Sequence, residues 1–128
     1  MAMARLRNAF VLLFTAGLIS SCGSSYSAPS NPSSTPIPAG PSTVLAPNGS
    51  YLGPGSGFQP PTLTVSAGTT VTFGNNDVTA HTSVADNGAW SSGNINPGQT
   101  FTVTLNNKGN FTYHCTIHPF MNGTIVVQ

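Results

Sequence analysis

The stretch FTVTLNNKGNFTYHC, residues 101–115, decides the fold class of this chain. Large apolar residues alternate with polar ones on both sides of a short polar turn: Phe101, Val103 and Leu105 before it, and Phe111, Tyr113 and Cys115 after it. Successive side chains of a β-strand point to opposite faces, so this alternation puts the apolar residues of each segment on one face. The stretch predicts two strands joined by a turn, with Cys115 at the end of the second.

Similar segments lie outward from this stretch in both directions. Apolar residues alternate with threonine or serine over residues 62–66 and 71–73, and Ile125 and Val127 continue the pattern near the end of the chain. Ala67-Gly68 and Pro97-Gly98 supply turn residues between these segments. Short alternating segments separated by Gly, Pro and Asn are typical of an antiparallel sandwich or barrel, and we find no helical periodicity. The prediction is an all-β fold.

Composition limits both the size and the partners of the folded part. Of 128 residues only 4% are charged, with three Lys or Arg and two Asp or Glu. Binding of nucleic acid requires clustered cations to neutralise phosphates, so that class of partner is excluded. Weak electrostatic steering also means that recognition of a protein partner depends on apolar shape. Residues 48–128 have room for one small domain.

The N-terminal residues have the pattern of an export signal. Arg5 and Arg7 precede an apolar run over residues 9–19, which is too short to span a bilayer as a helix. The following Ser-Ser-Cys22 resembles the lipobox of bacterial lipoproteins, which implies lipidation of Cys22 and anchoring to a membrane. An ordinary cleavage site that happens to contain Cys22, or a disulfide between Cys22 and Cys115, are the alternatives.

The next segment, residues 23–47, consists mostly of Ser, Pro, Thr, Ala, Asn and Gly. Such a composition offers too little apolar surface to offset the entropy of ordering the chain. We therefore expect residues 1–22 to be a lipoprotein-type signal, residues 23–47 a flexible linker, and residues 48–128 the folded domain.

Four side chains suggest a metal site. Cys115, His118 and Met121 are spaced C-x2-H-x2-M after a predicted strand, and His81 on an earlier predicted strand would complete the set across the sandwich. A thiolate, two imidazoles and a weak thioether suit copper, whereas structural zinc sites rarely use Met and iron–sulfur clusters need more cysteines. Taken singly, each residue also has an ordinary structural interpretation, such as a buried Cys or a gap-filling Met.

The sequence around these residues resembles the cupredoxins, specifically their plastocyanin and amicyanin branch. The stretch YHCTIHPFM at 113–121 is similar to the amicyanin ligand loop, and further matches lie at Asn76-Asp77, at Pro97-Gly98-Gln99 and over residues 123–127. The resemblance covers residues 58–128. It implies a cupredoxin-like Greek-key β-sandwich, one copper ion held by His81, Cys115, His118 and Met121, and electron transfer without substrate turnover.

Two positions differ from the family pattern. Thr82 follows the first His where the family commonly has Asn, which braces the ligand loop, so we expect a weaker brace here. Ile117 stands where the amicyanin loop has Pro, and it restores a backbone N–H close to the Cys115 sulfur. Our hypothesis is that this N–H donates to the thiolate and raises the reduction potential.

Other residues near the loop have secondary roles. In the family, an apolar patch around the second His ligand receives redox partners, and Pro119 and Phe120 are the candidates for it here; alternatively, Phe120 only packs beneath the loop. Strand alternation directs His114 outward, away from the face of Cys115, although the family resemblance also offers it as part of a second electron route. Trp90 is expected to fill the core or to cover its edge, without a redox role.

The expected function is that of a monomeric single-electron carrier, which meets a donor and an acceptor protein transiently at the cell envelope. The alternative is an envelope copper carrier or sensor without an electron-transfer role. A copper enzyme of related fold needs additional His ligands, and only His114 remains once His81 and His118 are used. A metal-free adhesion module is the third possibility.

Overall fold

The computed structural model describes residues 35–128. The predicted signal, the lipidation of Cys22 and most of the predicted linker lie outside these residues. The described part contains no helix, so no helix there is long and apolar enough to cross a membrane.

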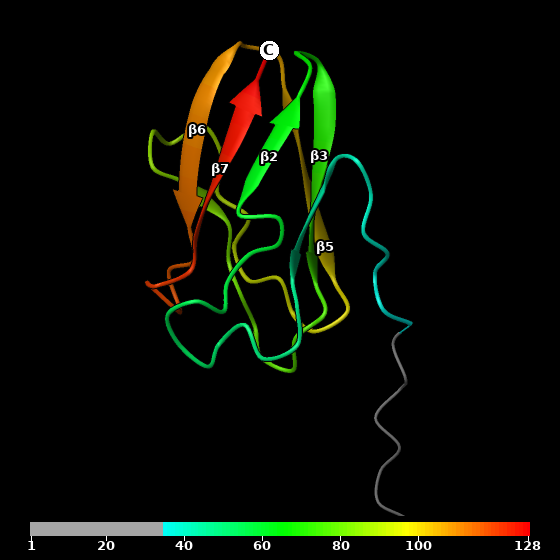
Figure 1. The fold of residues 1–128 in the computed structure, drawn as a ribbon, viewed down its shortest axis with the longest axis vertical. Helices are drawn as coiled ribbons and strands as arrows, with labels where there is room; N and C mark the ends of the chain where they lie inside the picture. The colour runs from blue at the N-terminus through cyan, green and yellow to red at the C-terminus, as the bar shows by residue number, and fades with distance from the viewer. Residues whose placement is uncertain (1–34) are drawn as a thin grey trace, which may run out of the picture. The chain divides into compact units, whose positions relative to one another are not determined.

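Residues 35–128 form two β-sheets (Figure 1). One sheet has the order β1-β3-β5 and the other the order β2-β7-β6-β4. The strands are β1 (Thr43–Ala46), β2 (Thr62–Val65), β3 (Thr69–Asn75), β4 (Val84–Ala85), β5 (Thr100–Leu105), β6 (Gly109–His114) and β7 (Asn122–Val127). The predicted all-β fold is confirmed, and the two alternating segments of the 101–115 stretch are β5 and β6.

The pairing of the strands differs from the expected antiparallel arrangement. The pairs β3–β5, β4–β6 and β6–β7 are antiparallel, but β1–β3 and β2–β7 are parallel. Alternation determines which side chains face the core; it does not determine which strand lies alongside or in which direction it runs. The sheets are therefore mixed.

The folded domain also begins earlier than predicted. Strand β1 lies within the segment expected to be a flexible linker, yet Val44 and Ala46 are buried in the core. Upstream of it, the Ile37 backbone N–H donates to Asn76 Oδ1 at 2.8 Å, and Asn76 Nδ2 donates to the Ile37 carbonyl at 2.9 Å. The linker prediction is wrong for these residues, because a four-residue alternation is too short to stand out in a Ser- and Pro-rich segment.

Aromatic rings fill the core between the sheets. Tyr113 on β6 meets Phe73 on β3 edge to face, with ring centroids 5.1 Å apart, and Phe58 lies at the same distance on another side. Trp90 is buried against the same group, as predicted, and its indole N–H donates to Ser83 Oγ at 3.0 Å. These contacts hold β6, which leads into Cys115, against the opposite sheet.

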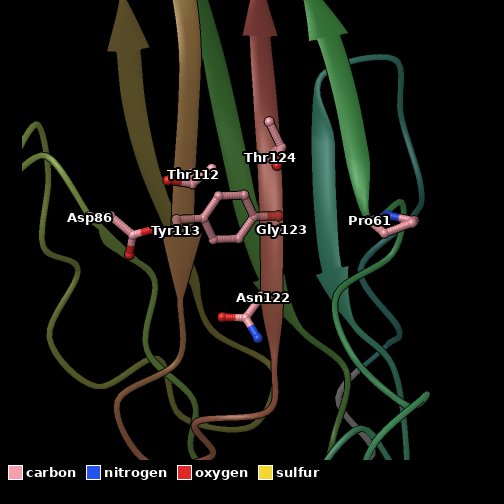
Figure 2. Close-up of a pocket in the computed structure, with 7 residues that line it drawn as sticks. All are labelled: Pro61, Asp86, Thr112, Tyr113, Asn122, Gly123 and Thr124. Carbon is pink, nitrogen blue, oxygen red and sulfur yellow. The ribbon is translucent and has the colours of Figure 1, made fainter.

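Tyr113 also depends on its neighbour across the ladder, Gly123 on β7. Figure 2 shows the ring reaching from β6 to Gly123, where a Cβ atom would overlap the phenol oxygen. That oxygen is buried without a hydrogen-bond partner among the described residues, and burial raises the pKa of Tyr113. The surface hollow drawn in Figure 2 includes none of the four candidate metal ligands.

The two ends of the sandwich are different. The connection between β6 and β7, residues 115–121, lies at one end, and the C-terminus lies at the other (Figure 1). At the latter end, the Gln128 N–H donates to the Val65 carbonyl and the Ala67 N–H donates to the Gln128 carbonyl, each at 2.9 Å. The last residue is thus fastened to the β2 side of its sheet.

Candidate metal centre

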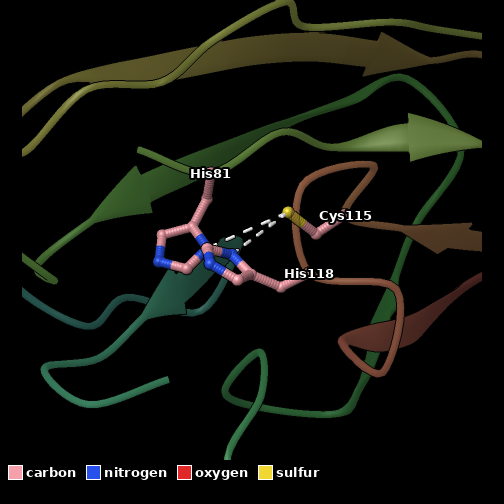
Figure 3. Close-up of side chains that lie close together, drawn as sticks. All are labelled: His81, Cys115 and His118. Atoms are coloured by element: carbon pink, nitrogen blue, oxygen red, sulfur yellow. Dashed lines mark hydrogen bonds between the residues drawn. The ribbon is translucent and has the colours of Figure 1, made fainter. Parts of the chain in front are cut away.

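Three of the four predicted ligands converge at the loop end of the sandwich. His81, Cys115 and His118 each direct one donor atom to a common point, and these atoms lie within 4.8 Å of one another (Figure 3). The Cys115 sulfur is 3.9 Å from Nδ1 of each histidine, and the two Nδ1 atoms are 3.2 Å apart. Cys115 and His81 are buried, and His118 is half-buried.

The spacing of these atoms fits a transition-metal ion. A triangle with sides of 3.9, 3.9 and 3.2 Å has a centre about 2.1 Å from each corner, close to metal–imidazole bonds of about 2.0–2.1 Å and metal–thiolate bonds of about 2.3 Å. One thiolate and two imidazoles in a trigonal arrangement, with a weak axial group, are the donors that copper takes in electron-transfer sites. The residues present therefore fit a copper ion.

The loop that carries two of these groups is closed by its own backbone. The Cys115 N–H donates to the Met121 carbonyl at 3.0 Å, and the Met121 N–H donates to the His118 carbonyl at 2.9 Å. These two bonds draw residues 115–121 into a compact turn. Met121, the predicted fourth ligand, lies in this turn and is fully buried.

The surroundings of Cys115 favour its deprotonated form, the thiolate. Burial alone would raise the pKa of its thiol, but hydrogen bonds from His81, from the Thr82 N–H and from the backbone of His118 and Ile117 outweigh burial and lower the pKa to about 5. The Thr82 N–H lies 3.3 Å from the sulfur. A low thiol pKa is what a metal-binding cysteine needs, because the thiolate is the form that binds metal. The hypothesis that the Ile117 N–H donates to the sulfur stays a prediction.

Thr82 is bonded to the ligand loop through its side chain. Its hydroxyl oxygen accepts the Thr116 N–H at 2.8 Å and lies 3.0 Å from the Thr116 hydroxyl. Thr82 itself is buried. A threonine side chain is shorter than the Asn common in the family, yet its hydroxyl reaches Thr116 in the loop. The weaker brace stays a prediction.

His81 is held by a loop and not by a strand, in contrast to the prediction. It follows β3 and pairs with Ile95 through two backbone hydrogen bonds, of 3.1 and 2.8 Å. Its Nε2, on the far side of the ring from Cys115, lies 3.0 Å from Asp77 Oδ2 and 3.2 Å from Ser50 Oγ. Burial lowers the pKa of His81, but the bonds and charges of Cys115 and Asp77 outweigh burial and leave it raised.

The sequence did not reveal Ser50 as part of this centre, and it marked Asp77 only as part of a match to the family pattern. Both are buried, and the Ser50 hydroxyl donates to Asp77 Oδ2 at 2.8 Å. Burial favours the neutral carboxyl, but bonds from the Gly49 N–H, Ser50, His81 and the Val78 N–H outweigh it and lower the pKa of Asp77. The position of Asp77 four residues before His81 was a second signal, beside the family match, that could have pointed to this contact.

Two aromatic rings lie beside His118. Phe120 is half-buried against the core with its ring centroid 6.0 Å from that of His118, and the Tyr51 ring lies 6.5 Å away on another side. The large apolar residues with the most exposed surface belong to the loops that carry Tyr51, His81 and His118: Leu52 at 72%, Val78 at 67% and Ile117 at 44%. Pro119, between His118 and Phe120, is also exposed.

His114 points away from the three ligands, in agreement with strand alternation. Its Nδ1 lies 2.6 Å from Asp86 Oδ1 at the surface. It is the histidine that the metal cluster leaves out.

Comparison with known proteins gives consistent matches. The sequence model of the cupredoxin-like domain matches residues 54–127. Amicyanin from Paracoccus versutus is 33% identical over 76 residues, covering 56% of this chain and 58% of that protein. Chloroplast plastocyanin from Chlamydomonas reinhardtii is 38% identical over 94 residues, covering 60% of this chain and 64% of that protein. The chain thus spans less than two thirds of the length of these relatives.

A solved structure also matches the fold. A purple cupredoxin from Nitrosopumilus maritimus superposes with a TM-score of 0.64 at 29% identity, covering 68% of this chain and 99% of that one. The fold, the matched span and the clustered ligands agree with the resemblance found in the sequence. The chain belongs to the cupredoxin-like family.

Proposed function

We propose that this chain is a single-electron carrier that binds one copper ion through His81, Cys115, His118 and Met121. The observation that carries the proposal is the convergence of the Cys115 sulfur and two histidine Nδ1 atoms within 4.8 Å. Copper bound there would alternate between Cu(I) and Cu(II), gaining and losing one electron. The chain would act without turnover of a substrate, as a carrier and not an enzyme.

The surroundings of the ligands support a site that changes little between the two oxidation states. Cys115 is fixed by the Thr82 N–H and by the closed 115–121 turn, and His81 is fixed by Ile95 and Asp77. Ligands that are already in place need little rearrangement when the charge of the metal changes. A rigid, buried donor set of this kind favours rapid electron transfer over delivery of the metal to another protein.

The apolar surface around His118 supports the docking of redox partners. Exposed apolar residues, Leu52, Val78, Ile117 and Pro119, occur in the loops that also carry Tyr51, His81 and His118, and Phe120 packs against the core. The residues carry no charge, so an encounter there would be brief and governed by shape. We propose that a donor and an acceptor each meet a monomer at this surface.

The signal-like pattern of residues 1–22 supports a proposal about where in the cell the chain is located. We propose that the chain is exported and held at the cell envelope, on the periplasmic or another extracytoplasmic face, by lipid on Cys22. Transient partners at that membrane would then be within reach of the domain.

The experiment is a visible spectrum of the full chain after addition of Cu(II). Strong red absorption, bound copper at one ion per chain and reversible bleaching by a reductant are expected. Cys115→Ser should remove the absorption, and the matched variant His114→Gln should keep it. A colourless protein that binds Cu(I) would favour the copper carrier or sensor, and absence of stoichiometric copper would favour the adhesion module.

A further inference from the structure

In the proposed function the buried carboxylate of Asp77 serves only as one of the groups that hold His81 in place. Its side chain is fully buried, and it touches His81 on the nitrogen that faces away from the metal cluster. Asp77 and Asp86 are the only acidic residues of the chain, and Asp86 is at the surface. One of two acidic groups is thus placed directly behind a metal ligand.

The contacts of Asp77 require it to be charged and held still. Its Oδ1 accepts the Gly49 N–H at 3.1 Å and the Val78 N–H at 2.7 Å, and its Oδ2 accepts the Ser50 O–H at 2.8 Å. The His81 Nε2–H, at 3.0 Å, completes four donors to one carboxylate. An acceptor-only group with four donors is a carboxylate and not a neutral acid.

A buried charge needs a partner of opposite sign. Among residues 35–128 the one Lys or Arg is Lys108, in the turn between β5 and β6, and it makes no salt bridge with Asp77. His81 is the partner that the structure provides, and its imidazole gains positive character when Nδ1 donates to a metal cation. The more positive the metal, the stronger this pairing becomes.

We propose that Asp77 is a positioning residue that directs His81 Nδ1 to the metal and favours Cu(II) over Cu(I). This inference rests on the proposed function. The Nε2–H donated to Asp77 fixes the tautomer, so the Nδ1 lone pair faces Cys115 and His118. Ser50 and Gly49, which hold the carboxylate, precede the matched span of residues 54–127, so a segment outside the family match contributes to this control.

The test compares Cu(II) and Cu(I) affinities of the full chain, each measured against a competing chelator, with the midpoint potential measured independently. Asp77→Asn keeps the shape and removes the charge, and Asp86→Asn removes the other acidic charge as a matched control. Loss of an outer partner of a metal ligand typically changes affinity 10–100-fold. We expect Asp77→Asn to lower the affinity for Cu(II) at least tenfold relative to the affinity for Cu(I). Each factor of ten raises the midpoint potential by about 59 mV. Asp86→Asn should change the ratio less than threefold.

A second variant, Ser50→Ala, distinguishes the effect of the Asp77 charge from a general loosening of the structure around His81. It removes a donor from the carboxylate and also removes the hydroxyl that lies 3.2 Å from His81 Nε2. Both changes leave the His81 Nε2–H bonded more strongly to Asp77, so the Cu(II)/Cu(I) affinity ratio should rise where Asp77→Asn lowers it. If Asp77→Asn does not fold, Ser50→Ala carries the test alone. An unchanged ratio in a red-absorbing Asp77→Asn protein, or a fall in the ratio of Ser50→Ala, overturns the inference and leaves the proposed function intact. A wild-type chain without the absorption overturns the proposed function instead.

Discussion

The brace between Thr82 and Thr116 can be tested by Thr82→Val, which replaces the hydroxyl with a methyl group of similar size. The substitution keeps the Thr82 N–H that faces the Cys115 sulfur and removes the acceptor of the Thr116 N–H, at 2.8 Å. A donor that loses its partner costs about 1–3 kcal/mol when buried. Residue 116 is exposed, so water can reach it in part, and we expect a loss of about 1–2 kcal/mol.

The assay is urea unfolding of the metal-free full chain, followed by the fluorescence of Trp90, its single tryptophan. For a domain of this size each kcal/mol corresponds to about 4–8 °C in Tm, so a thermal melt gives a second reading. Thr82→Ser keeps the hydroxyl and should be the more stable variant, although it loses a methyl group. Thr104→Val, which breaks an exposed hydroxyl pair with Thr70, should stay within about 0.5 kcal/mol of the wild type.

Two results would refute the reasoning. One is a Thr82→Val protein as stable as the wild type, which would mean that the Thr116 N–H gains nothing from its acceptor. The other is a Thr82→Ser protein at least as unstable as Thr82→Val, which would assign the effect to packing of the methyl group.

Three further predictions concern other parts of the domain. Gly123→Ala should lower the unfolding free energy by about 1–3 kcal/mol in the same urea assay, because its Cβ would overlap the Tyr113 phenol, whereas Gly57→Ala, with its nearest contact at 4.0 Å, should cost less. Because the pKa of Cys115 is lowered, its thiolate stabilises the metal-free fold fully above the unfolded pKa of 9.0, and this stability is lost as pH falls toward about 5. Urea titrations from pH 9 to 5 should show this fall in unfolding free energy for the wild type and not for Cys115→Ser. Ile117→Pro removes a backbone N–H that lowers the pKa of Cys115, so the reduction potential should fall; an unchanged or raised potential contradicts the hypothesis.

The sequence pattern was sufficient to predict those parts of the structure that depend on residues close together in the chain. Alternation identified β5 and β6 and the inward faces of Tyr113 and Cys115, because a strand repeats every two residues. The grouping of His118 with Cys115 also followed from spacing, since both belong to one short loop.

Contacts between residues far apart in the chain could not be predicted from the sequence pattern. The parallel pairing of β2 with β7 joins segments about 60 residues apart, and nothing in either segment specifies the other. Ser50 reaches Asp77 across 27 positions and His81 across 31. A serine in a Gly- and Pro-rich stretch has the composition of a surface turn, so only the folded chain reveals that it is buried behind a metal ligand.

The separation of the 115–121 loop from the C-terminus has a practical consequence for electrochemistry (Figure 1). A chain immobilised on an electrode through Gln128 would present the His118 end to the solution, where a soluble partner could exchange electrons with it. The same chain adsorbed through its apolar loops would present that end to the electrode itself. Attachment at opposite ends of the sandwich should therefore give fast exchange with a dissolved protein in one orientation and fast direct voltammetry in the other.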